Sequence, residues 1–298
     1  GVIINPKLLE GEAFREPQGD WKPVQEIITF LRTLFDASDH VGYVNESLQR
    51  DNTDKFVPAN EGYMSRTSST LIAQLERCNG DIGAVFGDYN PKAGMWVRIN
   101  ALDGHGAKNE NVVSYKYALV ECDDLSLAKQ NEAIRKLQLP VATLTYSGAK
   151  SIHAIVRVDA TNAEEYRQRV EFLYKICEKN GLIVDTANKN PSRLSRLPGV
   201  KRGGKKQFLI ETNLGKPSWD EWREWIENTN DDMPVFKNLG VAKDQGLPPK
   251  AEELIHGVLR NGHKMLIAGP SKAGKSFALI ELAMACLLYT SPSPRDTR

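Results

Sequence analysis

The segment 115–185 constrains the fold more than any other part of the chain, because its apolar residues change repeatedly between strand and helix spacing. Alternation of apolar and polar residues predicts four strands, over 115–122, 141–146, 151–158 and 182–185. Helical spacing predicts two helices between them, over 126–138 and 161–179. The second helix starts with the capping-box pattern Thr161-x-x-Glu164 and ends at Gly181.

The resulting order, β-α-β-β-α-β, is that of a ferredoxin-like or RNA-recognition-motif sheet. In this topology the first and third strands are neighbours at the centre of the sheet, and both helices cover one face. We therefore predict an α+β domain. Before it, the patterns predict helices over 23–35 and 68–77 and strands over 82–87 and 95–102.

Polar side chains of three predicted strands are expected to share the face of the sheet that the helices leave open. Residues two apart in a strand point to the same side. The apolar residues that would face the helices are Ala118, Val120, Cys122, Ile152, Ala154, Val156, Val158, Leu182 and Val184. The polar residues on the opposite side are Glu121, Asp123, Ser151, His153 and Asp185. Three carboxylates, a serine and a histidine are therefore predicted to converge on one open surface.

Glu121, Asp123 and Asp185 are candidate catalytic residues and candidate ligands of divalent cations. Neighbouring ionised carboxylates repel each other, and a bound cation removes this cost. Hard oxygen donors suit Mg²⁺ or Mn²⁺. Two such ions can bind both the attacking and the leaving oxygen of a phosphoryl displacement. The alternative is a set of solvated acidic residues on an exposed sheet.

Basic and polar residues near these acids are candidate contacts for the phosphates of a nucleotide. Lys150, Ser151 and His153 follow a flexible turn and are predicted to bind phosphate. For His153 the alternative is packing in the core. Arg193 and Arg196 are three apart, so on a helix they would share a face and could neutralise phosphates together.

A basic stretch follows the third acid. No acidic residue occurs between Thr186 and Ile210, where seven basic residues lie, although the whole chain has 39 basic and 38 acidic residues. Such a local excess indicates a surface that faces phosphate. A hairpin-like segment near its end is predicted to bind the template backbone, with a solvated loop as the alternative. Its basic residues are Lys201, Arg202, Lys205 and Lys206.

The segments ALVECDD, SGAKSIHAIVRV and VDTANKNPSRLSRLPGVKR resemble the three motifs of the archaeo-eukaryotic primase superfamily, most closely in primase-polymerases of phages, plasmids and integrated elements. The family's acidic pair, serine-x-histidine motif and third acid correspond to Glu121 with Asp123, Ser151 with His153, and Asp185. The first acid is often Asp in the family, and Glu keeps the ligand chemistry. The resemblance covers 80–215 well and 1–80 loosely. It implies template-directed nucleotidyl transfer with two metal ions, NTP or dNTP substrates and a single-stranded DNA template.

The sequence GPSKAGKS matches the phosphate-binding P-loop pattern G-x-x-x-x-G-K-[ST] in full, with Gly269, Gly274, Lys275 and Ser276. A predicted strand over 263–268 precedes it and a predicted helix over 277–285 follows it. Backbone amides would cradle the phosphates of ATP, Lys275 would reach them, and Ser276 would hold Mg²⁺. The surrounding sequence resembles the start of the RecA-like ATPase domain of plasmid and phage replicative helicases, which implies a hexamer for the full-length helicase.

The C-terminal sequence CLLYTSPSPRDTR resembles one reading frame of a transposase-end adapter used in sequencing libraries, and we interpret it as an assembly artefact. We therefore expect a truncated α/β ATPase fragment, and the missing N-terminal methionine fits a fragment as well. The predicted parts are 1–79, the N-terminal part of the primase domain; 80–215, the catalytic core; 216–250, a Trp-rich helix and linker; 251–285, the start of the ATPase domain; and 286–298, the tail.

Composition excludes several classes of protein. The four cysteines form no CxxC pair and do not cluster with histidines, which argues against a zinc finger and favours a reducing compartment. No run approaches about 18 apolar residues, so no membrane span is predicted. With no signal-peptide pattern, we expect a cytoplasmic protein. Trp219, Trp222 and Trp225 are predicted to pack in the core or between domains rather than to stack on bases.

Together these features predict a primase-polymerase of a mobile element (phage, prophage or plasmid) that is joined to a replicative helicase. One alternative is a non-catalytic module that holds single-stranded nucleic acid for the helicase. Another is a plain P-loop ATPase whose N-terminal half binds a partner. A sheet that only binds nucleic acid normally uses aromatic rather than acidic side chains, which favours catalysis.

Overall fold

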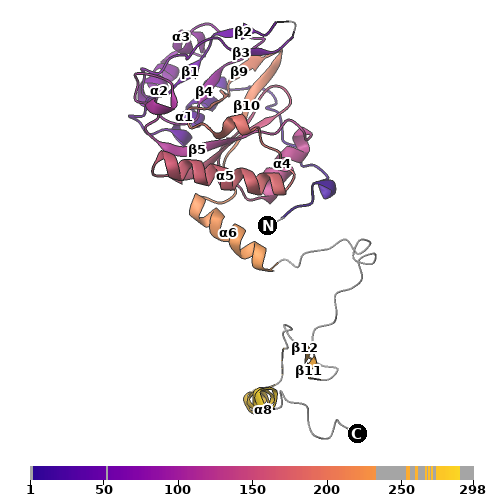
Figure 1. Ribbon diagram of the computed structural model, residues 1–298. Coiled ribbons are helices and arrows are strands. Elements are labelled where there is room, and N and C mark those ends of the chain that lie inside the picture. Colours follow the sequence, from indigo (N-terminus) through magenta and orange to yellow (C-terminus); the bar gives the residue numbers. More distant parts are fainter. Residues whose placement is uncertain are drawn as a thin grey trace. The chain divides into compact units, whose positions relative to one another are not determined.

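The computed structural model describes residues 3–51, 53–232, 253–255, 259–260, 266, 268, 270 and 273–288. The chain divides into two units, Gly1–Met233 and Pro234–Arg298, which are described separately (Figure 1). Among the residues within these ranges, no helix has the length and apolarity needed to cross a bilayer.

A five-stranded antiparallel sheet forms the centre of the first unit. In spatial order its strands are β5 (Tyr115–Val120), β7 (Ile152–Ala160), β6 (Val141–Tyr146), β10 (Lys205–Leu214) and β9 (Val200–Arg202). The first and third predicted strands, β5 and β7, are therefore neighbours as expected, but β5 lies at the edge of the sheet and not at its centre, because the predicted fourth strand does not pair with it. The hairpin of β9 and β10 extends the sheet beyond β6 and confirms the hairpin-like reading of the basic segment.

The predicted fourth strand is wrong. Residues 182–185 run beside β5 without forming a ladder, and the amide of Asp185 donates to the carbonyl of Glu121 at 3.4 Å. The chain turns at once into the 3₁₀ helix η3 (Thr186–Lys189), so the segment is too short to pair further. The apolar residues Leu182 and Val184 are nevertheless buried on the predicted face.

Three helices cover one face of the sheet: α4 (Leu127–Lys136), α5 (Ala163–Lys179) and α6 (Trp219–Asp232). Figure 1 shows α5 lying along this face. All nine apolar residues assigned to it from the strand alternation are buried there. The cap of α5 lies one residue later than predicted: Asn162 accepts from the amide of Glu165, whose carboxylate accepts from the amide of Thr161 at 2.7 Å.

The tryptophan helix packs on the same core, as predicted. Trp219 and Trp222 are buried among residues of this cluster, and Trp225 packs against its edge. The indole N–H of Trp222 donates to the carbonyl of Leu137 at 2.9 Å. The helix α6 therefore belongs to the first unit and not to a linker between domains.

The opposite face of the sheet is not open, contrary to the prediction. It is covered by α1 (Pro23–Leu34), α2 (Ser68–Arg77) and a three-stranded sheet of β1 (Tyr43–Val44), β4 (Trp96–Arg98) and β8 (Leu194–Arg196). These elements bury Leu119, Ala142 and Ile155 of the central sheet. Apolar residues also occur on the polar side of the alternation, and their burial stabilises a second layer there.

Smaller elements complete this unit: η1 (Pro6–Leu8), the hairpin of β2 (Ser47–Gln49) and β3 (Phe56–Pro58), α3 (Gly83–Phe86) and η2 (Asn109–Asn111). The strand predicted over 82–87 is wrong, because α3 forms there. The glycine that follows it, Gly87, has φ +79° and ends the helix, as a glycine at this position commonly does.

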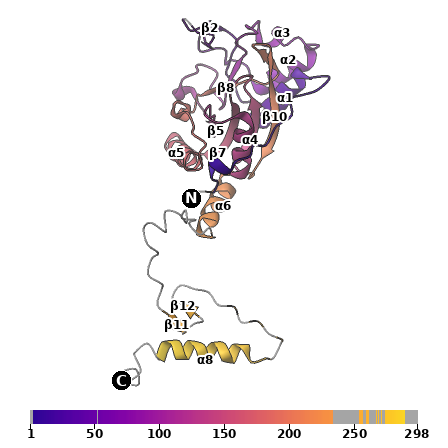
Figure 2. The same ribbon diagram turned by 90° about the vertical axis from the view of Figure 1, so that its right-hand side faces the viewer.

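The second unit contains a short hairpin of β11 (Glu253–Ile255) and β12 (Leu259–Arg260), and the helix α8 (Lys275–Leu288) (Figure 2). The helix predicted after the P-loop is present. The strand predicted over 263–268 lies outside the described residues except for Leu266 and Ala268.

Candidate active site

The carboxylate of Glu121 is the centre of the candidate site. Glu121 follows β5 directly, and His153 and Ser151 lie in and just before the neighbouring strand β7. The hydroxyl of Ser151 donates to Oε1 of Glu121 at 3.0 Å, and Nε2 of His153 lies 3.1 Å from the same oxygen. The structure thus brings together three of the predicted residues around one carboxylate oxygen.

The other ring nitrogen of His153 decides its tautomer. The backbone N–H of Arg196 donates to Nδ1 at 3.3 Å, and the hydroxyl of Ser195 lies 3.0 Å from it. A nitrogen that accepts an N–H carries no proton, so the neutral ring has its proton on Nε2 and donates it to Glu121. His153 is only 5% exposed. Its ring is therefore both packed in the protein and engaged at both nitrogens.

Glu121 is held in its ionised form. Burial by itself would raise the pKa of this carboxyl, but the electrostatic interaction and the hydrogen bond with His153, together with the hydroxyl of Ser151, bring the pKa down to about 2. Hydrogen bonds to the charged form stabilise it in this way. The site consequently presents a fixed negative charge at neutral pH.

Asp123 and Asp185 do not converge on Glu121 in the way that the strand alternation predicts. The strand β5 ends at Val120, so the two-residue alternation does not extend to Asp123, which lies in an exposed bend. Asp185 has its amide beside Glu121, and its carboxylate is 3.9 Å from Arg193. Within the described part of the chain, no three His, Cys, Asp or Glu residues are close enough to hold a metal ion. As placed, the three carboxylates do not form the predicted ligand set.

Two predicted phosphate-binding arginines have different surroundings. Arg193 directly precedes β8 and Arg196 is the last residue of that strand, so they do not lie on a helix and do not share a face as predicted. Arg196 is buried, donates to the carbonyl of Ala93 at 2.7 Å and lies over the ring of Trp96 at 4.4 Å. Burial lowers the pKa of Arg196 to about 9. Its side chain is an internal packing element, whereas Arg193 stays beside Asp185.

The four basic residues of the β9–β10 hairpin also separate. Lys201 and Lys205 are exposed. Lys206 donates to the carbonyl of Pro17 at 3.0 Å and lies over the ring of Trp21 at 5.6 Å, so it is bound to the N-terminal segment.

Arg202 turns back toward the acidic residues. Its guanidinium donates to the carbonyl of Ser147 at 2.9 Å. Burial lowers the pKa of Arg202, while the negative charges of Glu121 and Asp123 raise it. Arg202 is therefore a cation of the candidate site itself.

Gln130 in α4 positions the site and was missed in the sequence. Its amide nitrogen donates to the carbonyls of Leu125 and Lys150 at 2.7 and 2.9 Å, and its oxygen accepts from the amide of Ile152 at 2.9 Å. Gln130 thereby joins the segment after Glu121 to the turn before β7. Lys150 is exposed at the end of this turn. A polar residue on the apolar face of a helix, with Ala133 and Ile134 three and four positions on, is the signal that could have found it.

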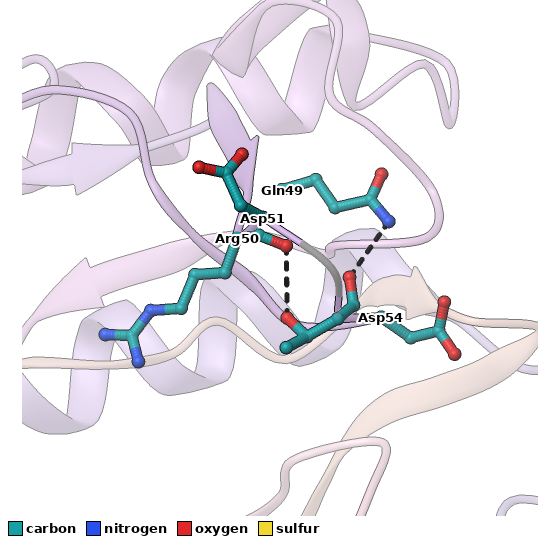
Figure 3. A pocket seen from close by; sticks show the side chains of 5 residues that line it. Gln49, Arg50, Asp51 and Asp54 are labelled. Atoms are coloured by element: carbon teal, nitrogen blue, oxygen red, sulfur yellow. Dashed lines mark hydrogen bonds between the residues drawn. The ribbon is translucent and has the colours of Figure 1, made fainter.

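A hollow of about 390 Å³ lies in the turn between β2 and β3, and no predicted site residue lines it (Figure 3). Hydrogen bonds between residues of the turn hold the residues that line it in place. The side chain of Gln49 donates to the carbonyl of Thr53 at 3.0 Å, and the hydroxyl of Thr53 donates to the carbonyl of Arg50 at 3.1 Å. This hollow is the interior of a turn and is not part of the candidate site.

In the second unit, Lys275 begins α8 and Gly274 before it has φ +75°. The ammonium of Lys275 donates to the carbonyl of Pro270 at 2.6 Å, back across the loop where the motif would hold phosphate. Ser276 is exposed at the start of the helix. Gly269 lies outside the described residues.

The family model of the AAA domain matches residues 229–294, which include the predicted P-loop. This match indicates a P-loop ATPase region in the C-terminal part of the chain. No curated protein matches the sequence.

Similar solved structures are primase and primase-polymerase domains. One is the AEP domain of the cyanophage S-2L primase-polymerase, with 21% identity and a TM-score of 0.43, covering 67% of this chain and 96% of that chain. A second is the catalytic domain of primase RepB′ in complex with initiator DNA, with 14% identity, a TM-score of 0.40 and coverages of 72% and 100%. A structure of primase RepB′ has 14% identity, a TM-score of 0.40 and coverages of 77% and 70%.

Proposed function

We propose that the unit Gly1–Met233 is a DNA primase-polymerase of a mobile element, which joins nucleotides on a single-stranded DNA template. The observation that carries this proposal is the ionised carboxylate of Glu121, held by Ser151 and His153 on the neighbouring strand. A buried serine and a buried histidine both bond to one mostly buried carboxylate, and perturbed carboxylates of this kind cluster at functional sites.

Nucleotidyl transfer also needs positively charged side chains near the reacting phosphates. A hydroxyl attacks the α-phosphate of an NTP or dNTP, the new phosphodiester bond forms, and pyrophosphate leaves. Catalysis of such a step consists of positioning and of stabilising the developing negative charge. Arg202 and Arg193 are cations beside the acidic residues and are suited to that charge. Lys150, exposed at the turn before Ser151, is a further candidate contact for the triphosphate.

The proposal includes Asp123 and Asp185 as catalytic acids and a requirement for Mg²⁺ or Mn²⁺. Carboxylate oxygens suit both ions. Glu121, Asp123 and Asp185 would hold the ion, which would supply positive charge to the reacting phosphate. The metal requirement is tested by activity after chelation and after return of each ion.

A second candidate function is a non-catalytic module that holds single-stranded nucleic acid. This function needs only the exposed cations Lys201 and Lys205 of the β9–β10 hairpin, which can contact a phosphate backbone without a catalytic group. The exposed Lys201 and Lys205 would serve either function.

We further propose that the second unit binds ATP through Gly269, Gly274, Lys275 and Ser276, and that the intact protein couples primer synthesis to a replicative helicase. The order of the two units along the chain fits this coupling. The AAA-domain match over 229–294 supports the ATPase part.

The test of the proposed function is primer synthesis on a single-stranded DNA template with NTPs or dNTPs and Mg²⁺ or Mn²⁺. Glu121→Gln removes the charge at the centre of the site, and Glu171→Gln makes the same change on the exposed face of α5 as a matched control. We expect synthesis by the wild type and by Glu171→Gln, and none by Glu121→Gln. Template binding without synthesis by the wild type would support the second candidate.

A further inference from the structure

A basic hollow of about 390 Å³ lies beside the candidate site, at the residues that precede β8. Three cationic side chains line it, those of Arg98, Lys108 and Arg193, and no acidic residue does. Asn109 and Ser192 add polar groups to its wall. None of the functions described above accounts for Arg98 or Lys108.

Arg98 is fixed in place without a carboxylate. Its guanidinium donates to the carbonyl and the hydroxyl of Ser192 at 2.7 and 3.1 Å, and to the carbonyl of Glu61 at 3.1 Å. The hydroxyl of Ser192 gives its single proton to the carbonyl of Ala107, so it accepts from Arg98. Arg98 takes part in none of the ion pairs found in the described ranges.

Two residues that line the hollow each have an N–H donor without an acceptor. The Nε atoms of Arg98 and Arg193 are buried and have no hydrogen-bond partner among the described atoms. Arg98 as a residue is only 9% exposed, and burial lowers its pKa, although the charge of Glu61 acts in the opposite direction. A buried, charged donor without an acceptor is costly. The negative charge of an anion in the hollow would offset the burial of the Arg98 charge.

We propose that this hollow is a phosphate-binding site. Arginine forks and a lysine are the usual partners of phosphate oxygens. The volume of about 390 Å³ is more than ten times the roughly 30 Å³ share of one water molecule, so a single phosphate or a short chain of phosphates fits. The phosphate comes either from the triphosphate of a nucleotide or from a nucleic-acid backbone. Only the use of the site in nucleotidyl transfer rests on the proposed function, and phosphate binding does not.

The first experiment is calorimetric titration of the full chain with tripolyphosphate in the presence of EDTA, so that no metal takes part. Lys108→Gln removes an exposed cation of the hollow, and Lys175→Gln makes the same change on α5. We expect affinity to fall about tenfold in Lys108→Gln, the size of one charge-assisted hydrogen bond, and to stay unchanged in Lys175→Gln. Arg98→Lys, with its fold checked by circular dichroism, should lose at least as much.

Equal affinity in the wild type, Lys108→Gln and a folded Arg98→Lys would overturn the proposal, and so would the absence of binding by the wild type. If Arg98→Lys does not fold, the comparison of tripolyphosphate affinity between Lys108→Gln and Lys175→Gln tests the proposal by itself.

Two further titrations identify the source of the phosphate. ATP without metal and a single-stranded oligonucleotide without terminal phosphates are each compared between the wild type and Lys108→Gln. Weakening of ATP alone assigns the nucleotide triphosphate, and weakening of the oligonucleotide alone assigns the backbone. Tripolyphosphate binding at the hollow, together with normal synthesis by Glu121→Gln, would retain this inference while refuting the proposed function.

Discussion

Nε2 of His153 lies 3.1 Å from Oε1 of Glu121, across the neighbouring strands β5 and β7. The backbone N–H of Arg196 approaches the opposite side of the ring. The histidine therefore links the second layer of the protein to the carboxylate at the centre of the candidate site, and its removal affects both.

Substitution of this histidine should cost both stability and activity. His153→Ala leaves a cavity and removes the partner of Glu121 and of the amide of Arg196. We expect a loss of about 2–4 kcal/mol in the free energy of unfolding, measured by urea denaturation. His153→Gln keeps an N–H donor and should recover part of this loss. In the folded variants, we expect a higher KM for the nucleotide and unchanged template affinity. Unchanged nucleotide kinetics in a destabilised His153→Ala would assign His153 to packing alone.

Removal of the charge of Asp123 should separate catalysis from folding. Asp123 is exposed in the bend after β5, so Asp123→Asn leaves packing intact. We expect primer synthesis to be abolished while the melting temperature stays the same or rises, as is common when an active-site charge is removed. Asp124→Asn changes the adjacent exposed acid and is the control. Full synthesis by Asp123→Asn would exclude it from catalysis.

Gln130 should control the geometry of the site from a distance. Gln130→Leu keeps the side-chain volume close to its original value and removes three hydrogen bonds. We expect a loss of about 1–3 kcal/mol in stability, because the carbonyls of Leu125 and Lys150 are left without their donor. We also expect a lower kcat with little change in template affinity. Gln168→Leu on the exposed side of α5 serves as the control. An unchanged kcat in folded Gln130→Leu would limit the role of Gln130 to the fold.

The basic hairpin should contribute to template binding through two of its four basic residues. Lys201 and Lys205 are exposed, whereas Lys206 is bound to Pro17. Each lysine that meets a phosphate of a single strand adds about 0.7 to the slope of log affinity against log salt. The double variant Lys201→Gln and Lys205→Gln should therefore flatten the slope measured by fluorescence anisotropy by roughly 1.4. Lys206→Gln should leave it unchanged. Equal slopes in all proteins would identify the hairpin as a solvated loop.

The C-terminal limit of the first unit should lie after α6. Trp222 is fully buried and hydrogen-bonded to Leu137. We expect a fragment ending at Met233 to unfold cooperatively and a fragment ending at Gly215 to be unstable or aggregated, because it lacks a large aromatic part of the core. Thermal unfolding followed by circular dichroism compares them. Equal melting temperatures of the two fragments would place the C-terminal limit of the first unit at residue 215.

Local features were readable in the sequence because their causes are local. The alternation of apolar residues in β5 and β7 correctly assigned Ala118, Val120, Ile152 and Ala154 to one face, since strand geometry alone sets that parity. The adjacency of β5 and β7 followed from the order of the elements. The two covering helices were found for the same reason, and only the cap of α5 was displaced, by one residue, to Asn162.

The environment of each site residue was decided by contacts between segments far apart in the chain. The face expected to be open is covered by α1, α2 and the three-stranded sheet, so His153 and Arg196 are buried rather than exposed. Where β5 ends, at Val120, determines that Asp123 leaves the alternation, and strand length depends on which neighbour is available for pairing. The basic hollow joins Arg98, Lys108 and Arg193 from separate segments. Local periodicity carries no information on such encounters, because they depend on which surfaces pack together when the two layers close.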